Sequence, residues 1–78
     1  MQAKLLGVMK VNFTNSQNEA VQGTNLFVAF QDEAVEGLRC EKFFLKDSIA
    51  LPKNTKINDV IDIIFNFKGK IEKVEQLN

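Results

Sequence analysis

The residues that could carry out acid–base chemistry in this chain are two pairs of carboxylates, Asp59 with Asp62 and Glu72 with Glu75. Each pair is three residues apart, and in an extended strand that spacing places the two side chains on opposite faces. The two carboxylates of a pair therefore cannot act on one substrate from a single strand. The chain also has no histidine, so the commonest general base is missing. We predict that the protein is not an enzyme.

Metal and cofactor chemistry has equally little support in the sequence. A zinc site needs four ligands, and Cys40 is the only cysteine in a chain without histidine. No glycine-rich loop has the spacing that cradles phosphates in nucleotide-binding proteins. We therefore expect no metal and no cofactor. Cys40 has the parity of the apolar residues around it, and we expect it to be a small buried hydrophobic residue.

A binding surface is the remaining possibility, and the last third of the chain offers the first one. Phe65 and Phe67 precede a lysine-flanked glycine, Lys68-Gly69-Lys70. Gly69 is suited to the positive φ angle of a tight turn. In one interpretation both phenylalanines belong to the core and the lysines protect an edge. In the other, a phenylalanine stacks on a base while the lysines hold a phosphate chain, as in proteins that bind single strands.

A second candidate surface lies on the strand expected at residues 38–46. It combines Arg39, Lys42 and Lys46 with two adjacent phenylalanines, Phe43 and Phe44. Two neighbouring residues of a regular strand cannot both face the same core. Either a β-bulge near Lys42 brings both rings to one side, or one ring is left for solvent, a ligand or a partner chain.

Five strands are predicted to position these residues. Alternating apolar residues and turn signals place the strands at about residues 5–14, 25–31, 38–46, 59–67 and 70–77. Asn15 to Asn18 have the composition of a turn, and residues 32–37 form a loop closed by glycine. Asp47 to Pro52 could form a single helical turn that ends at the proline.

These elements indicate an all-β fold in a single domain, residues 1–78. The chain is 45% hydrophobic and 26% charged, which is typical of a folded protein. Five strands in so short a chain cannot build two covered sheets, whereas a small, partly open barrel removes most exposed edges. We expect an OB-like barrel, with an SH3-like barrel as the alternative.

The pattern NDVIDIIFNFKGKI at residues 58–71 resembles the end of small OB-like proteins from phages and conjugative elements of Gram-positive bacteria. The expected architecture is also similar to that of the filamentous-phage gene V single-stranded DNA-binding proteins. The resemblance implies single-stranded nucleic acid as the ligand and a dimer as the assembly. It implies contacts from six residues in particular, namely Lys42, Phe44, Lys46, Phe67, Lys68 and Lys70; Arg39 is added from the second surface.

Charge and composition leave an alternative open. The formal net charge is zero, which argues against a strongly basic surface, although residues 15–37 carry only acids and residues 38–56 are rich in lysine and arginine. A protein-interaction or structural accessory domain, forming a homodimer or binding another protein, is the second hypothesis. The single cysteine, the lack of a signal peptide and the absence of a long apolar segment predict a cytoplasmic protein without a membrane partner.

Overall fold

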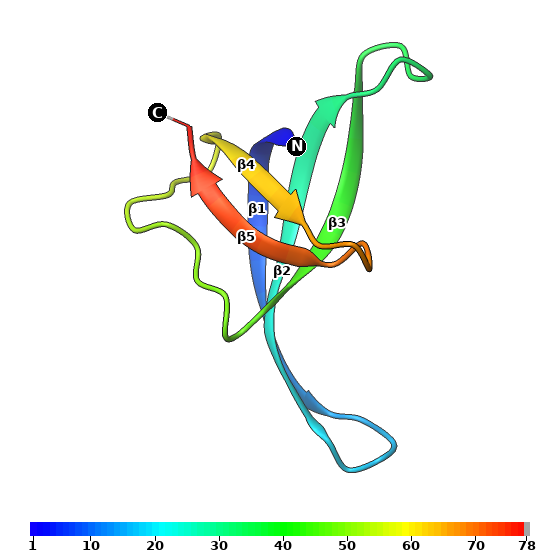
Figure 1. Ribbon diagram of the computed structural model, residues 1–78, viewed down its shortest axis with the longest axis vertical. Helices are drawn as coiled ribbons and strands as arrows, with labels where there is room; N and C mark the ends of the chain where they lie inside the picture. The colour runs from blue at the N-terminus through cyan, green and yellow to red at the C-terminus, as the bar shows by residue number, and fades with distance from the viewer. Residues whose placement is uncertain (78) are drawn as a thin grey trace.

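One antiparallel sheet of five strands makes up the computed structural model, which describes residues 1–77 (Figure 1). The strands lie in the order β3-β2-β1-β4-β5. Their bounds are Gln2–Thr14 for β1, Ala20–Gln31 for β2, Leu38–Lys46 for β3, Val60–Phe65 for β4 and Ile71–Gln76 for β5. The all-β prediction is confirmed, and so are the number of strands and the bounds of β3.

The sheet curls into a partly open barrel in which β1 pairs with two strands over different parts of its length. Its first residues, Gln2 to Lys4, pair with β4, while most of the strand pairs with β2. The curl brings β5 next to β3, but no strand pairing joins these two strands, so the barrel keeps an open seam (Figure 1). The Phe43 and Phe65 rings meet edge to face, with 5.3 Å between ring centroids, and this contact joins β3 to the end of β4.

The core lies on the concave face of the sheet. Leu26 and Val28 of β2 and Ile61 and Ile63 of β4 are fully buried, as their alternation predicts. Burial of a side chain of this size stabilises the fold by roughly 1.5–3 kcal/mol. The remaining core residues come from the other three strands: Ala3, Leu5, Leu45, Ile71 and Val74.

Two β-bulges lie elsewhere than predicted. The β1–β2 register shifts between Leu5 and Gly7, and the β4–β5 register shifts between Ile64 and Phe65. Of the two alternatives for β3, the bulge near Lys42 is wrong and the exposure of one ring is confirmed, because β2 and β3 pair without interruption along the whole of β3. The consequence is that Phe43 packs against the core whereas Phe44 lies on the outer face with 40% of its surface exposed.

Two further predictions are corrected by the structure. Cys40 is exposed rather than buried, because the unbroken register gives it the same parity as Phe44. The helical turn predicted after β3 does not form. A single hydrogen bond from the Ile49 N–H to the Lys46 carbonyl (2.9 Å) closes one turn, and Pro52 then disfavours helical geometry at the residue before it. Residues 47–59 instead form a loop that connects β3 to β4, and Ile49 of this loop packs against the core.

The β1–β2 hairpin extends beyond the barrel as an arm, which we define as residues 12–22, the part of the hairpin that has no pairing with β3 (Figure 1). β1 and β2 are both longer than expected for this reason. The turn at its tip has the predicted asparagine chemistry: the Asn15 Oδ1 accepts hydrogen bonds from the Gln17 and Glu19 N–H groups, and Asn18 has a φ of 59°. The arm carries exposed apolar side chains, including Phe13.

Candidate nucleic-acid interface

The outer face of β2 and β3 brings three of the predicted site residues into one row. Lys42, Phe44 and Lys46 alternate along β3 and share a face, with Phe44 between the two lysines. Their partners on β2 are Phe27, Asn25 and Gly23, in that order. Phe27 is 37% exposed and is diagonal to Phe44, so two aromatic rings reach solvent on this face.

Two glycines form the floor under these rings. A Cβ atom on Gly23 would lie 2.5 Å from the Phe44 Cζ, so the Phe44 ring rests against the β2 backbone. A Cβ on Gly7 of β1 would lie 3.8 Å from the Phe27 Cδ2. The prediction missed Phe27 as a surface residue. The signal that could have revealed it is a glycine inside a strand, which often marks a place where another group approaches the backbone closely.

The β4–β5 hairpin presents the second aromatic element. Phe67 lies in its turn with 95% of its surface exposed, and the Lys68 Nζ is 5.8 Å from the Phe67 ring centroid. The interpretation in which both phenylalanines belong to the core is wrong for Phe67, because β4 ends at Phe65 and the Phe67 ring lies in solvent. The turn at Gly69 is confirmed by its φ of 78°.

Asn66 holds this turn together, a role the sequence did not suggest. Its Oδ1 accepts hydrogen bonds from the N–H groups of Lys68 (2.9 Å) and Lys70 (3.1 Å). The Asn66 N–H donates to the Lys70 carbonyl (2.8 Å), and the Gly69 N–H donates to the Asn66 carbonyl (3.0 Å). The exposed phenylalanine and the two lysines are therefore carried by a turn with fixed backbone geometry.

A pocket of about 240 Å³ at the open seam connects the hairpin to β3. Lys46 enters it from β3 and Lys70 from the hairpin, and Phe44 lies beside them. The rest of its wall is formed by Phe43, Phe65, Gly69 and Ile71. The structure thus brings together cationic and aromatic residues that are more than twenty positions apart in the sequence. Lys42, Phe67 and Lys68 do not line this pocket but lie on the elements that form it.

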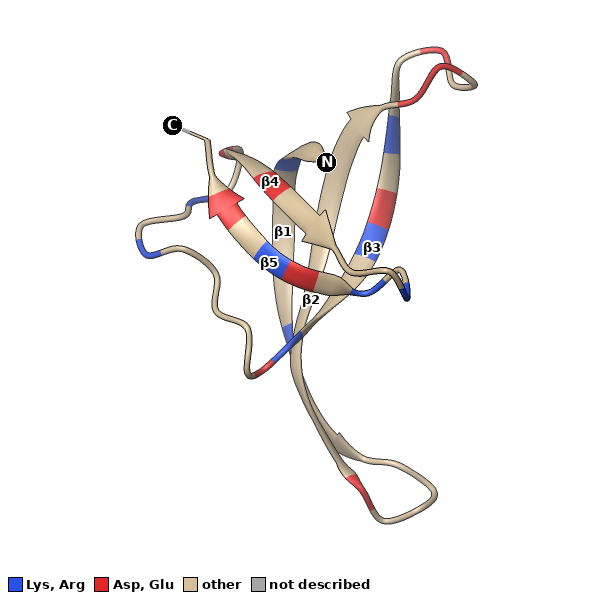
Figure 2. Cartoon of the chain, viewed as in Figure 1, with Lys and Arg blue, Asp and Glu red and all other residues tan. Residues whose placement is uncertain are grey.

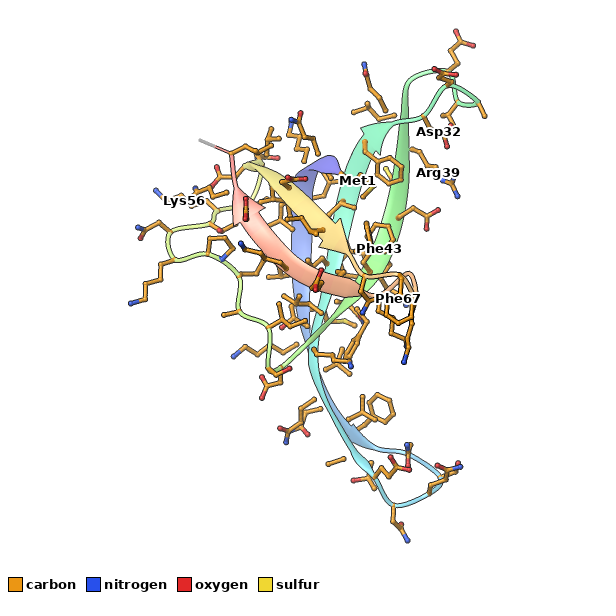
Figure 3. The ribbon with its side chains drawn as sticks, in the orientation of Figure 1. Met1, Asp32, Arg39, Phe43, Lys56 and Phe67 are labelled. Atoms are coloured by element: carbon orange, nitrogen blue, oxygen red, sulfur yellow. The ribbon has the colours of Figure 1, made fainter. Side chains whose placement is uncertain are left out.

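Arg39 does not join this group. It has the opposite parity on β3, and its guanidinium contacts the Asp32 Oδ2 (2.8 Å) and the Glu41 Oε1 (2.7 Å). The hydrogen bond from Arg39 holds the pKa of Asp32 below its usual value, and the Ala34 N–H adds to this effect. The hydrogen bonds from Arg39 to Asp32 and Glu41 raise the pKa of Arg39. Figure 3 shows Arg39 beside Asp32 at the β2–β3 loop, well away from Phe67.

Acidic and basic segments are interspersed over the sheet (Figure 2). Lys46 ends β3, and Lys68 and Lys70 lie in the turn between β4 and β5, whereas the acids Asp32, Glu33 and Glu36 belong to the β2–β3 loop at the other end of β3. Within residues 1–77, neither these three lysines nor Lys42 forms an ion pair. Their ammonium groups are therefore not held by a carboxylate and can contact an anion.

Residues 1–77 contain no group of three cysteine, aspartate or glutamate side chains arranged to hold a metal ion. The same residues include no helix with the length and apolar character that a bilayer crossing needs. No protein-family model, curated protein or solved structure matches the chain.

Proposed function

We propose that this protein is a non-catalytic, OB-like barrel that binds single-stranded nucleic acid across the outer face of β2 and β3 and along the β4–β5 hairpin. The observation that carries the proposal is the position of Phe44: an exposed ring between two lysines without ion pairs, next to a pocket that Lys70 of the hairpin also lines. Aromatic rings beside a line of cations are the combination by which small barrels hold single strands.

The strand arrangement supports this assignment. Five antiparallel strands in a partly open barrel are the architecture of an OB fold, whose ligands lie on the β2–β3 face between the β1–β2 and β4–β5 loops. In this chain the same strands carry Phe27 and Phe44, and the β4–β5 loop carries Phe67.

The neutral net charge sets the expected strength of binding. Stacking contributes roughly 1–3 kcal/mol per base, and three exposed rings are available. Four lysines on β3 and the hairpin can neutralise about four phosphates, so log K should fall with log salt with a slope of about −3. Such binding has moderate affinity and uses lysines gathered on one part of the surface. It therefore does not require a net positive charge on the whole protein. We place it in the cytoplasm, as part of a phage or other mobile element.

A second candidate function is favoured by the arm. Phe13 is exposed on the arm, and Val8 and Met9 are exposed on the part of β1 that leads into it. Exposed apolar side chains gathered on one element are typical of protein contact sites. A protein-interaction domain would bind through the arm and would show little dependence on salt.

Fluorescence anisotropy with labelled single-stranded oligonucleotides, at low and at moderate salt, tests the proposed function. We expect micromolar binding that weakens steeply with salt. Phe44→Leu should weaken binding at every salt concentration, because it removes a stacking surface and keeps the charge. Lys42→Gln with Lys46→Gln should weaken binding and also flatten the salt dependence.

Lys56→Gln is the control for the loss of a positive charge away from this face. Lys56 lies on the β3–β4 loop, across the molecule from Phe43 and Phe67 in Figure 3, and its substitution removes one charge without touching the face. Absence of binding at low salt, or equal losses from Lys56→Gln and from the β3 lysines, would contradict the proposed interface and favour the arm as the functional surface.

A further inference from the structure

The free edge of β1 is the feature of the molecule that the proposed function does not use. β4 pairs with β1 only at Gln2 to Lys4, and the loop before β4 adds hydrogen bonds only at Leu5, to Asn58 and Asp59. From residue 8 to residue 14, β1 pairs with β2 on one side and with no other strand of residues 1–77 on the other. A long unpaired edge of this kind is a template for pairing with another strand.

The hydrogen bond at the tip of the arm shows which backbone groups face this edge. The Asn15 N–H donates to the Glu19 carbonyl (2.9 Å), so Asn15 and Glu19 form a hydrogen-bonded pair. Such pairs alternate along an antiparallel ladder, so the odd-numbered residues Val11 and Phe13 bond to β2. The N–H and C=O groups directed at the free edge therefore belong to the even-numbered residues: Val8, Lys10, Asn12 and Thr14.

The side chains of this segment favour a second copy of the same strand. Met9 and Phe13, 49% and 53% exposed, lie on the same face, two residues to either side of Val11. An antiparallel copy related by a two-fold axis at Val11 places Met9 opposite Phe13 of the second copy, and Phe13 opposite its Met9. Both apolar side chains then gain an apolar partner across the edge.

Neighbouring registers are less favourable. An axis at Lys10 would place Lys10 opposite itself, and two like charges directly opposite each other destabilise a strand pair. An axis at Asn12 would leave Met9 opposite Asn15 and bury no apolar pair at that position. Only the axis at Val11 places Lys10 opposite the neutral Asn12 and lets all four edge residues of each copy form hydrogen-bonded pairs.

We propose that the protein forms a two-fold symmetric dimer in which the β1 strands of two copies pair antiparallel, centred on Val11. An axis of this kind keeps corresponding faces on the same side, so the β1–β3 sheets of the two copies join into one continuous sheet. The outer faces of the two copies become neighbours on one surface. The contact involves fewer residues than the roughly 20–30 a side of a standard interface, so we expect micromolar affinity.

Single-cysteine cross-linking tests both the dimer and its register. In a Cys40→Ser background, which removes the exposed natural thiol, Val11→Cys places one cysteine at the axis. Residues facing each other in a non-hydrogen-bonded pair have Cα atoms about 4.5 Å apart, and a disulfide spans about 4.4–6.8 Å. We expect oxidation to give a disulfide-linked dimer for Val11→Cys. Met9→Cys and Phe13→Cys are the matched controls, and each should cross-link poorly alone but well when combined in one chain.

Sedimentation of uncross-linked protein over a range of concentrations provides a second measurement. Asn12→Pro removes an N–H group that faces the free edge, so the β1–β2 ladder is retained while two intermolecular hydrogen bonds are lost. We expect it to raise the dimer dissociation constant about tenfold or more, whereas Asn12→Ala should change it less than about threefold. Circular dichroism confirms that each variant is folded.

Two results would overturn the proposal. One is a monomer at every concentration tested, and the other is cross-linking that is strongest for Met9→Cys or Phe13→Cys alone, which would place the axis elsewhere. Neither result bears on nucleic-acid binding, because the dimer depends on backbone groups at the free edge of β1, whereas the proposed ligand contacts come from side chains of β2, β3 and the hairpin and are measured separately by anisotropy. The two proposals can therefore fail separately.

Discussion

The Phe44 ring lies directly over Gly23, the residue of β2 that is paired with Lys46. The backbone at Gly23 has no side chain, and the ring occupies the space that a side chain would need. This contact fixes the direction of an aromatic ring that is otherwise half exposed to solvent. Glycine normally weakens the interior of a strand. Here Gly23 leaves the space in which the Phe44 ring lies, and the proposed function depends on the position of that ring.

We expect Gly23→Ala to destabilise the fold and to displace the Phe44 ring. The new Cβ would lie 2.4 Å from the Leu45 carbonyl oxygen and 2.5 Å from the Phe44 Cζ, and the backbone atom cannot move aside without shifting β3. Overpacking of this kind costs about 1–3 kcal/mol, which thermal unfolding would detect. Gly7→Ala is the control, because its Cβ would make an ordinary contact at 3.8 Å with Phe27. Equal melting of the two variants would contradict the close contact.

Gly69→Val should lower the melting temperature through backbone strain alone. Gly69 has a φ of 78°, and no atom lies within 4 Å of the position that its Cβ would take. A left-handed conformation costs an L-residue roughly 1–2 kcal/mol, and a β-branched side chain tolerates it poorly. Gly69→Asn should lower the melting temperature less than Gly69→Val, because asparagine adopts this conformation more readily. A melting temperature unchanged by valine would show that the turn adopts another geometry.

Ile63→Asp should prevent folding, because it puts an unpaired carboxylate at a fully buried position of β4. The loss should be at least about 4 kcal/mol, a large part of the stability of so small a domain. Phe67→Asp makes a similar change at an exposed position of the hairpin and should leave the fold intact. Far-UV circular dichroism distinguishes the two, and a folded Ile63→Asp protein would exclude this residue from the core.

Arg39→Gln should raise the pKa of Asp32 toward its usual range, because the hydrogen bond from Arg39 is the main cause of the lowered value. The rise should be incomplete, since the Ala34 N–H still donates to the same carboxylate. NMR titration of the Asp32 carboxyl carbon measures the shift directly. Lys42→Gln, on the opposite face of β3, should not move it, and an equal shift in both variants would contradict the assigned cause.

The same ion pair predicts a small dependence of stability on pH. The pKa of Asp32 is lower in the folded protein than in the unfolded chain, where it is about 3.9. The contribution of the ion pair is therefore complete above that value and is lost as the pH falls through the folded pKa. In wild type the free energy of unfolding should fall more steeply in this acid range than in Arg39→Gln, and denaturant unfolding at several pH values measures the difference.

Reversing the charges of Lys68 and Lys70 separates their role in binding from their role in folding. Lys68→Glu with Lys70→Glu should leave the melting temperature nearly unchanged, because the backbone groups of both residues, and not their charges, complete the turn with Asn66. Nucleic-acid binding should weaken strongly in the same variant, since two attractive charges become repulsive. Weakened folding would show that the lysine side chains stabilise the hairpin, and unchanged binding would remove the hairpin from the interface.

The sequence alone determined the local features of this protein. Period-two alternation predicted the five strands and the buried faces of β2 and β4, because the pleat of a strand directs successive side chains to opposite sides. Turn chemistry predicted the Asn15–Asn18 turn and the positive φ of Gly69, since these depend on the conformational freedom of a few neighbouring residues. The absence of a histidine was likewise visible without a fold.

The tertiary structure decided which strands are neighbours and which side chains reach solvent. The sequence left a bulge in β3 as one alternative and predicted a buried Cys40, but the unbroken β2–β3 register placed Cys40 and Phe44 on the outer face. Bulges lie instead near Leu5 of β1 and near Phe65 of β4, and the curl of the sheet brings Lys46 and Lys70 to one pocket. Alternation sets only the relative parity of residues within a strand. Register, curl and the pairing of distant strands depend on packing between segments far apart in the chain, which no local pattern records.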